Sequence, residues 1–292
     1  MQFLQLYKAD DINCMLSVPA KENRVNIFDY RPDLITKNLP QGTKYNLGDY
    51  LGHVIVDFML NKRNIDKDKE IPVKKHLYTV GSNIFGGSNR GNFQNATIWG
   101  SGILKEPLKR EAFFQRLSHR KLDIRAVRGP LTKKVLEEFG HTCPSIFGDP
   151  AILMPLIYNP EKPKVRKYSV VLQFLHEKKF KNKYSGEYII SMNTNDYKFV
   201  IDEIVSSEVI YTSSLHGIIL SEAYGIPAIP FRGLSKAIDF KYMDYYSSTG
   251  RTDVHLAETF EEALSSTPPP LPDLSTLQQG LIDTFPYDLW DS

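Results

Sequence analysis

The chain has 292 residues, a length that suits two α/β domains of roughly 100–150 residues better than one. Apolar residues make up 41% and charged residues 24%, a balance that excludes an intrinsically disordered protein. Lys and Arg exceed Asp and Glu by only 36 to 34, so net charge argues neither for nor against nucleic acid, and we expect no such partner.

The two cysteines, Cys14 and Cys143, stand far apart, with no paired motif and no histidine cluster beside them. This arrangement speaks against a zinc site and against a disulfide-stapled secreted domain, and it suits a reducing cytosol. The first residues lack a basic segment followed by an apolar core, and no run reaches about 18 apolar residues. We therefore expect a cytoplasmic protein without signal peptide, membrane-spanning helix or bound metal.

Strand-like and helix-like segments alternate along the chain. Runs rich in β-branched and aromatic residues predict strands at 24–28, 76–81, 96–102, 123–129, 168–175, 188–193 and 208–214, with a further one at 227–231. Segment 49–60 has an apolar stripe at helical spacing, and 130–140 has Pro130 at its start and Gly140 at its end, as helices prefer. Such alternation predicts an α/β fold of parallel sheets covered by helices.

The most linker-like region is 154–167, which contains three prolines and a burst of charge. We place a domain boundary there, with an N-terminal domain over 1–158 and a C-terminal domain over 159–265. The tail, 266–292, has a proline run and then a helix-like segment that can pack back on the first domain.

Small and polar residues follow several predicted strands. In open parallel sheets, ligands bind beyond the carboxyl ends of the strands, so we expect these turns to line one cleft between the domains. Glycines there let a ligand approach the backbone closely. The turns are Gly81-Ser82, Trp99-Gly100-Ser101-Gly102, Arg128-Gly129 and His216-Gly217, and the side chains assigned to the cleft are Asn46, Asp49, Ser82, Trp99, Ser101 and Arg128.

Most of these residues also have a structural explanation. Trp99 either stacks on a ligand or packs in a core. Asn46 and Asp49 precede a helix, where a turn and a cap require the same residue types. Arg128 is harder to explain in this way, because a guanidinium at a strand end suits bidentate binding of phosphate or carboxylate.

His216 lies in an uncharged run, 213–229, where a strand gives way to a helix. Ser213 or Ser214 is a natural N-cap, so His216 falls in the first helical turn, where backbone N–H groups and the helix dipole favour an anion. A lone histidine is also often a satisfied structural residue, and these residues alone leave both interpretations open.

Together these motifs resemble the polysaccharide pyruvyltransferase family over about residues 41–250. The resemblance rests on Asn46-Leu47-Gly48-Asp49, Trp99-Gly100-Ser101-Gly102, Arg128-Gly129-Pro130, Gly148-Asp149-Pro150 and, most specifically, on 206–229 and the 239–250 segment after it. It implies two Rossmann-like domains in a glycosyltransferase-B-like arrangement. It also implies transfer of pyruvate from phosphoenolpyruvate to two hydroxyls of a sugar, in a bacterial surface polysaccharide or its lipid-linked precursor, as a cyclic ketal and without a further cofactor.

On this resemblance His216 becomes the catalytic residue, because imidazole both gives and takes protons near neutral pH. Some family members carry Arg directly before Leu-His-Gly, where this chain has Ser214, so the donor's cation must come from elsewhere. We expect Lys241 and Arg232 to supply it, with Arg128 on the acceptor side. The donor-side residues are then Ser214, Gly217, Arg232, Lys236, Lys241 and His176.

Two alternatives remain open: a nucleotide-sugar-dependent glycosyltransferase of the same fold, in which a glutamate near Glu222 holds a ribose, and a non-catalytic glycan-binding protein. A screen of donors separates the first from a pyruvyltransferase. The lysine-rich stretch between Lys162 and Lys183 is either a solvated face or a peripheral contact with the inner face of the membrane, where a lipid-linked acceptor would lie.

Overall fold

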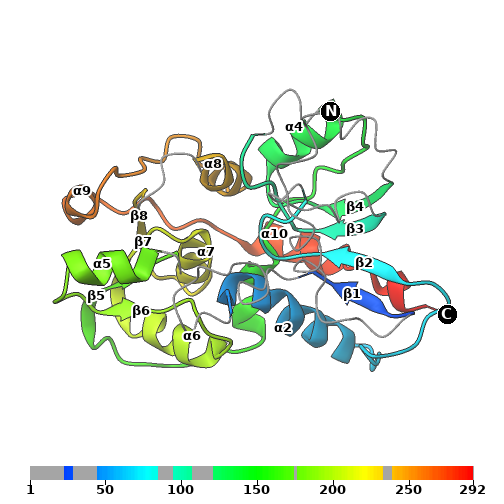
Figure 1. The fold of residues 1–292 in the computed structure, drawn as a ribbon, viewed down its shortest axis with the longest axis horizontal. Coiled ribbons are helices and arrows are strands. Elements are labelled where there is room, and N and C mark those ends of the chain that lie inside the picture. The colour runs from blue at the N-terminus through cyan, green and yellow to red at the C-terminus, as the bar shows by residue number, and fades with distance from the viewer. Residues whose placement is uncertain are drawn as a thin grey trace, which may run out of the picture.

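The computed structural model describes residues 23–28, 45–84, 95–106, 121–173, 176–232 and 239–291. Within these residues, eight strands form two four-stranded sheets in which every pairing is parallel (Figure 1). The first sheet has the order β1-β2-β3-β4, with β1 at Val25–Ile27, β2 at Lys75–Tyr78, β3 at Ala96–Trp99 and β4 at Leu122–Ala126. The second has the order β6-β5-β7-β8, with β5 at Arg166–Val171, β6 at Ile189–Ile190, β7 at Ser207–Thr212 and β8 at Ala228–Pro230. The predicted α/β fold with parallel sheets is confirmed.

Eight α-helices and two 3-10 helices are described. They are α2 (Leu47–Asn61), α4 (Pro130–Glu138), α5 (Glu177–Lys183), α6 (Tyr197–Val205), α7 (Leu215–Ala223), α8 (Asp239–Ser248), α9 (Phe260–Leu264) and α10 (Ser275–Asp283), with the 3-10 helices η3 (Pro150–Leu156) and η5 (Tyr287–Trp290). Those from α8 onward follow the last strand. In α2, the stripe that predicts the helix is the face that it buries, since Leu51, Ile55 and Met59 are fully buried.

The strands end earlier than the sequence predicts. β2 ends three residues before Gly81, and β3 ends at Trp99, before Gly100-Ser101-Gly102. Gly81 has a φ of 99° and Gly100 a φ of 80°, which turn the chain out of the extended conformation. β4 and β7 likewise end before Arg128 and Ser213, and residues 174–175 of the predicted strand 168–175 lie outside the described residues. The residues that were predicted to end these strands, but lie beyond them, form the turns of the candidate site.

The predicted linker at 154–167 is only partly a linker. Met154 belongs to η3 and is fully buried, so the start of this segment is core. η3 packs against both α2 and α7, and its Ile152 shares one apolar cluster with Leu51 of α2 and Ile218 of α7. Residues 158–165, without helix or strand, then lead into the second sheet. The two sheets are thus joined by a shared core.

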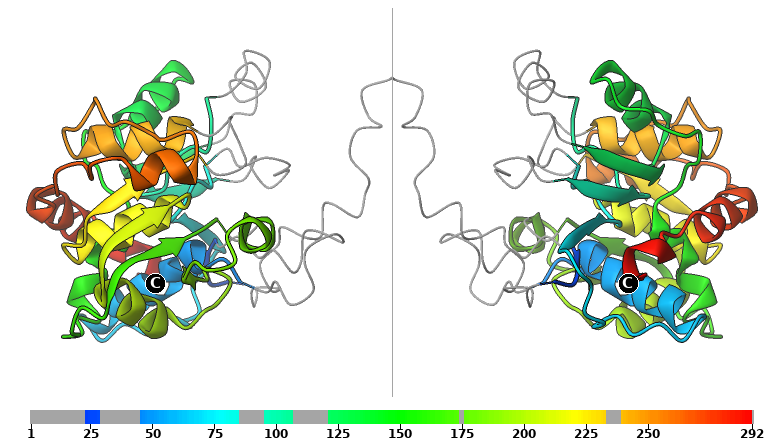
Figure 2. Two further views of the ribbon diagram at one scale, coloured as in Figure 1. Left: turned by 90° about the vertical axis from the view of Figure 1, so that its left-hand side faces the viewer. Right: turned by 90° about the vertical axis from the view of Figure 1, so that its right-hand side faces the viewer.

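The C-terminal tail returns to the first sheet. α10 packs against η3, and Trp99 Nε1 of β3 donates a hydrogen bond of 2.9 Å to the carbonyl oxygen of Leu281. Beyond it, Lys75 Nζ of β2 donates to the carbonyl oxygen of Leu289 at 2.9 Å. Figures 1 and 2 show this path in red, and Tyr287 OH of η5 donates to the carbonyl oxygen of Met59 in α2 at 3.1 Å.

No helix in the described part of the chain is long and apolar enough to cross a membrane.

Candidate functional site

His216 lies in the first turn of α7, directly after β7. Ser214 is the N-cap of this helix, and its Oγ accepts a hydrogen bond of 3.4 Å from the Gly217 amide. Gly217 allows the helix to lie close to the sheet, since a Cβ there would come within 2.3 Å of Thr212 Oγ1. The hydroxyl of Ser214 is therefore used by the helix, and the packing at Gly217 keeps the helix against the sheet.

The imidazole of His216 lies between Gly48 and Asp149. A Cβ on Gly48, in the first turn of α2, would lie 1.8 Å from His216 Nδ1, so the ring packs directly on this glycine. On the other side, His216 Nε2 lies 3.8 Å from Asp149 Oδ2. Nε2 is buried and has no hydrogen-bond partner among the described residues. His216 thus meets a buried carboxylate with one ring nitrogen unpaired.

Asp149 was not assigned to the site by the sequence, although Gly148-Asp149-Pro150 contributes to the family resemblance. Locally it behaves as the turn residue that the sequence suggests, because its side chain caps η3 by accepting from Ala151 N at 3.1 Å. It is fully buried, and its Oδ2 also accepts from Gly81 N at 3.5 Å. The capping motif that makes Asp149 a turn residue therefore also aims its carboxylate at His216.

Asp49 and Asn46 lie next to Gly48 at the start of α2. Asn46 Nδ2 donates to Asp49 Oδ2 at 2.7 Å, and Asp49 is buried. A Cβ on Gly81 would lie 2.2 Å from Asp49 Oδ1, so this carboxylate packs against the turn after β2. Two buried carboxylates, Asp49 and Asp149, thus flank the same turn.

Lys241, in the first turn of α8, supplies a buried cation to this region. It is 7% exposed, and among the described residues its ammonium has no hydrogen bond or ion pair, only a position 4.9 Å from the centre of the Tyr242 ring. Burial and the positive charge of Arg128 lower its pKa from 10.5 to about 8, while the charge of Asp49 partly offsets them. A buried ammonium without a counter-ion suits an anionic ligand.

Arg128 is fully buried and engaged by protein groups. Its Nε donates to Asp244 Oδ2 at 3.0 Å, its Nη1 to Ser82 Oγ at 2.5 Å, and its Nη2 to the carbonyl oxygen of Ile103 at 2.6 Å. The Asp244 carboxylate also accepts from the amide and the hydroxyl of Thr132. Through Asp244, three residues beyond Lys241, this network fixes α8 against the segment that carries Arg128 and Thr132. The guanidinium therefore serves this contact, and its contact with a ligand stays a prediction.

Two other predicted cleft residues, Ser101 and Trp99, lie fully inside the protein. Ser101 is fully buried, donating to the carbonyl oxygen of Gly81 at 3.2 Å and accepting from Asn83 N at 3.4 Å. Trp99 is also fully buried, and its ring is perpendicular to that of Phe285 with the centroids 4.9 Å apart. The structural interpretation of Trp99 therefore holds, because no ring face is left for a sugar.

The remaining donor-side residues differ in availability. Arg232 pairs with Asp239 at 2.7 Å and with Glu258 at 3.0 Å, so an anion would compete with two carboxylates. His176 is half-buried, and its Nδ1 has no hydrogen-bond partner among the described residues. Burial and the charges of Lys241 and Lys179 lower the pKa of His176. Lys236 lies outside the described residues.

Glu222, which lies near the position of the ribose-binding glutamate in the nucleotide-sugar alternative, is engaged internally. Its side chain is 1% exposed, and its carboxylate accepts from Arg251 through both oxygens at 2.7 Å and from Tyr245 OH at 2.7 Å. A ribose could reach this carboxylate only by breaking a buried ion pair, which speaks against the alternative that uses it.

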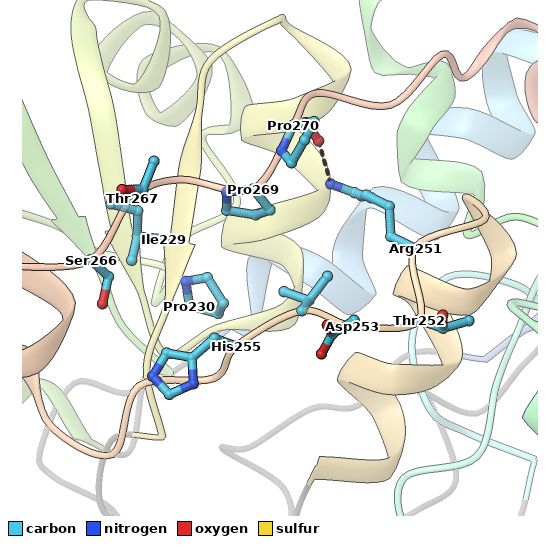
Figure 3. A pocket seen from close by; sticks show the side chains of 11 residues that line it. Ile229, Pro230, Arg251, Thr252, Asp253, His255, Ser266, Thr267, Pro269 and Pro270 are labelled. Atoms are coloured by element: carbon cyan, nitrogen blue, oxygen red, sulfur yellow. Dashed lines mark hydrogen bonds between the residues drawn. The ribbon is translucent and has the colours of Figure 1, made fainter.

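A pocket of about 570 Å³ lies apart from these residues, between β8 and two C-terminal segments (Figure 3). Arg251 reaches across its rim to the carbonyl oxygen of Pro270 at 2.9 Å. None of the predicted site residues lines it. In the described part of the chain, no group of three or more His, Cys, Asp or Glu side chains could hold a metal ion.

We call the residues brought together here the polar cluster: Asp49, Arg128, Asp149, His216 and Lys241. They come from the turns after β4 and β7 and from the starts of α2, η3, α7 and α8. The cluster combines an imidazole beside a carboxylate, suited to proton transfer, with an unpaired ammonium, suited to a phosphate or carboxylate.

Comparison with known proteins identifies the family and a similar fold. Residues 46–233 match the polysaccharide pyruvyl transferase family. An uncharacterized protein of Acanthamoeba polyphaga mimivirus is 27% identical over 217 residues, which cover 70% of this chain and 71% of that protein. A crystal structure of a functionally uncharacterized protein of Klebsiella pneumoniae is similar in fold, with a TM-score of 0.51 and 14% identity over 77% of this chain and 88% of that one.

Proposed function

Because the chain belongs to the polysaccharide pyruvyl transferase family, we propose that it transfers pyruvate from phosphoenolpyruvate to two hydroxyls of one sugar, forming a cyclic ketal. Two observations carry this proposal: Lys241 is buried, has no ion pair among the described residues and is influenced by the charge of Asp49, and the His216–Asp149 pair packs on Gly48, next to Asp49. Phosphoenolpyruvate carries a phosphate and a carboxylate, and it needs both a cation and a proton donor.

The donor binds with its phosphate or carboxylate at Lys241. This residue replaces the arginine that some relatives have at the position of Ser214, whose hydroxyl caps α7 instead. The amides at the start of α7 add a favourable dipole for an anion. Arg232 takes a smaller part than the sequence suggested, because Asp239 and Glu258 already pair with it.

The reaction requires protons to move in both directions. A proton is added to the methylene carbon of phosphoenolpyruvate while one sugar hydroxyl attacks the neighbouring carbon and loses its proton. A second hydroxyl then attacks that carbon, its proton leaves, and the C–O bond to phosphate breaks. The products are the ketal and inorganic phosphate, so no water is consumed. We assign proton transfer to His216, whose charged form is stabilised by Asp149, with Oδ2 3.8 Å from Nε2 of the ring.

We also infer a glycosyltransferase-B-like arrangement of two Rossmann-like domains, 1–158 and 159–265. Two four-stranded parallel sheets, and a polar cluster drawn from turns after strands of both, support it. Asn46, Asp49 and Ser82 then lie on the acceptor side. Arg128 keeps α8 in place through Asp244.

We propose a lipid-linked acceptor met at an anionic membrane surface. Lys167, Lys178, Lys179 and Lys181 are exposed and support it. In the same stretch, Lys162 pairs with Asp202 and Lys183 with Glu261, so these cations contribute less. Binding to vesicles should rise with anionic lipid and fall with salt, and binding insensitive to both would contradict the proposal.

The central experiment incubates the protein with phosphoenolpyruvate and a panel of glycosides, and measures the mass of each sugar and the release of phosphate. We expect one sugar to gain the mass of pyruvate less one water, with one phosphate released per ketal. A parallel arm replaces the donor with uridine diphosphate sugars. Glycosyl transfer in that arm, without reaction of phosphoenolpyruvate, would overturn the proposal in favour of the glycosyltransferase. Binding of glycans without any transfer would favour the non-catalytic alternative.

A further inference from the structure

A pocket of about 170 Å³ lies at the carboxyl ends of three strands of the second sheet. Leu172 of its wall follows β5, Ser213 follows β7 and Phe231 follows β8. In open α/β sheets, this edge is where ligands bind. The position of the pocket is therefore typical of a ligand-binding site in an α/β fold.

The pocket is walled mainly by aromatic and aliphatic side chains. Phe180, Phe231 and Phe260 form its buried floor, and the rings of Phe180 and Phe260 meet edge to face with centroids 5.1 Å apart. Tyr184, partly exposed, adds a wall 4.5 Å from the Phe180 ring. We call this site the aromatic pocket. Such walls favour an apolar ligand group.

Two of the three charged side chains that line the pocket, Glu258 and Lys183, are paired with neighbours, and the third is Lys179, which is exposed. Glu258 pairs with Arg232 at 3.0 Å, and Lys183 pairs with Glu261 at 3.0 Å. The volume is well below the roughly 300 Å³ at which complete ligand sites begin. The aromatic pocket therefore fits one apolar group, about the size of a ring, belonging to a larger ligand.

The aromatic pocket reaches Ser213, three residues before His216 of the polar cluster. His176 and Ser213 both line it. The charge of Lys241 contributes to the lowered pKa of His176, and Tyr242, next to Lys241, donates a hydrogen bond of 2.7 Å to the carbonyl oxygen of Ser213. A ligand with its reactive end at Lys241 and His216 can therefore extend an attached group into this pocket.

We propose that the aromatic pocket, although donor-side His176 lines it, binds an apolar group joined to the reducing end of the acceptor sugar, because phosphoenolpyruvate has no apolar group of this size. This inference rests on the proposed function and adds the subsite that recognises the acceptor's carrier. The sugar hydroxyls would meet the donor at the polar cluster, while the attached group is buried between Phe180, Phe260 and Tyr184.

The test compares each sugar of the panel as its methyl, octyl and nitrophenyl glycoside, with phosphoenolpyruvate as donor. We expect kcat/KM for an octyl or nitrophenyl glycoside to exceed that for the methyl glycoside by about tenfold or more, the lower end of what burying one apolar side chain contributes. A preference for octyl alone indicates an aliphatic carrier, and one for nitrophenyl alone indicates an aromatic carrier.

Phe180→Ala should remove this preference while leaving kcat/KM for the methyl glycoside nearly unchanged. If Phe180→Ala does not fold, Tyr184→Ala removes a partly exposed wall of the same pocket. Phe199→Ala, an exposed phenylalanine on α6, is the matched control and should keep the preference. Equal transfer to all three glycosides, or a preference that survives both pocket variants, would overturn the inference and leave the proposed function standing. Absence of transfer to every glycoside would overturn both.

Discussion

Replacement of Lys241 by Met separates a functional cation from a structural one. Met has a similar length and no charge, so it fills the site without an ammonium. The structure gives the size of the effect on stability, because burial and Arg128 lower the Lys241 pKa from 10.5 to about 8. A pKa drop of this size corresponds to a loss of about 3 kcal/mol in the free energy of unfolding at pH 7. The reference is a folded state in which the lysine keeps its ordinary pKa.

The sign follows from proton binding. Between pH 8 and 10.5 the unfolded chain holds the Lys241 proton and the folded protein has lost it, so the free energy of unfolding of the wild type rises with pH through this window. Below pH 8 both states hold the proton, and the full penalty is present. Lys241→Met should therefore increase the free energy of unfolding by up to about 3 kcal/mol at pH 7, and the gain should shrink toward pH 10.5.

The same change should weaken binding of the donor. Loss of a hydrogen bond to a charged group is worth about 1.5–3 kcal/mol, so the Kd for phosphoenolpyruvate should rise roughly 10- to 150-fold. In the wild type this affinity should decline above about pH 8, where Lys241 loses its proton. Calorimetry with phosphoenolpyruvate alone and denaturant unfolding between pH 7 and 10.5 measure both effects.

Lys167→Met, at an exposed lysine, is the matched control and should change neither quantity. Unchanged donor affinity in Lys241→Met would move the donor site away from α8. A lower stability in Lys241→Met would show that the ammonium is satisfied by the protein and is not held for a ligand.

Three further changes test the polar cluster. His216→Ala should lower the rate of pyruvate transfer by about 100-fold or more with donor affinity retained, and substantial turnover would return His216 to a structural role. Gly48→Ala places a Cβ 1.8 Å from His216 Nδ1 and must displace the ring. The transfer rate should fall at least about tenfold, while the circular dichroism spectrum stays unchanged. Gly186→Ala is the control, because a Cβ at Gly186 meets open space. Asp244→Ala leaves the buried Arg128 guanidinium without its carboxylate, and denaturant unfolding should show a loss of about 3–5 kcal/mol, which a stability equal to wild type would contradict.

The elements and their caps follow from the sequence because they depend on neighbouring residues. Ser214 caps α7 as its position before an apolar helical run predicts, and Gly225, two residues beyond the helix, has a φ of 70°. Pro130 likewise begins α4. These features need only a few consecutive residues, and they put His216 in a first helical turn before any tertiary contact is known.

The roles of individual side chains at the strand ends were decided by tertiary structure. Arg128 and Lys241 are both cations at plausible positions in the sequence, yet Arg128 is engaged by Asp244 while Lys241 has no ion pair in the described part of the chain. From the sequence, Trp99 could contact a ligand, but in the structure the C-terminal tail covers it, and its Nε1 donates to the carbonyl oxygen of Leu281. The sequence around Asp149 predicts only a turn. Its position near His216 depends on the packing of η3 against α7. Local sequence determines which residues begin and end an element, but partners far apart in the chain are chosen by how two sheets and a shared core pack together.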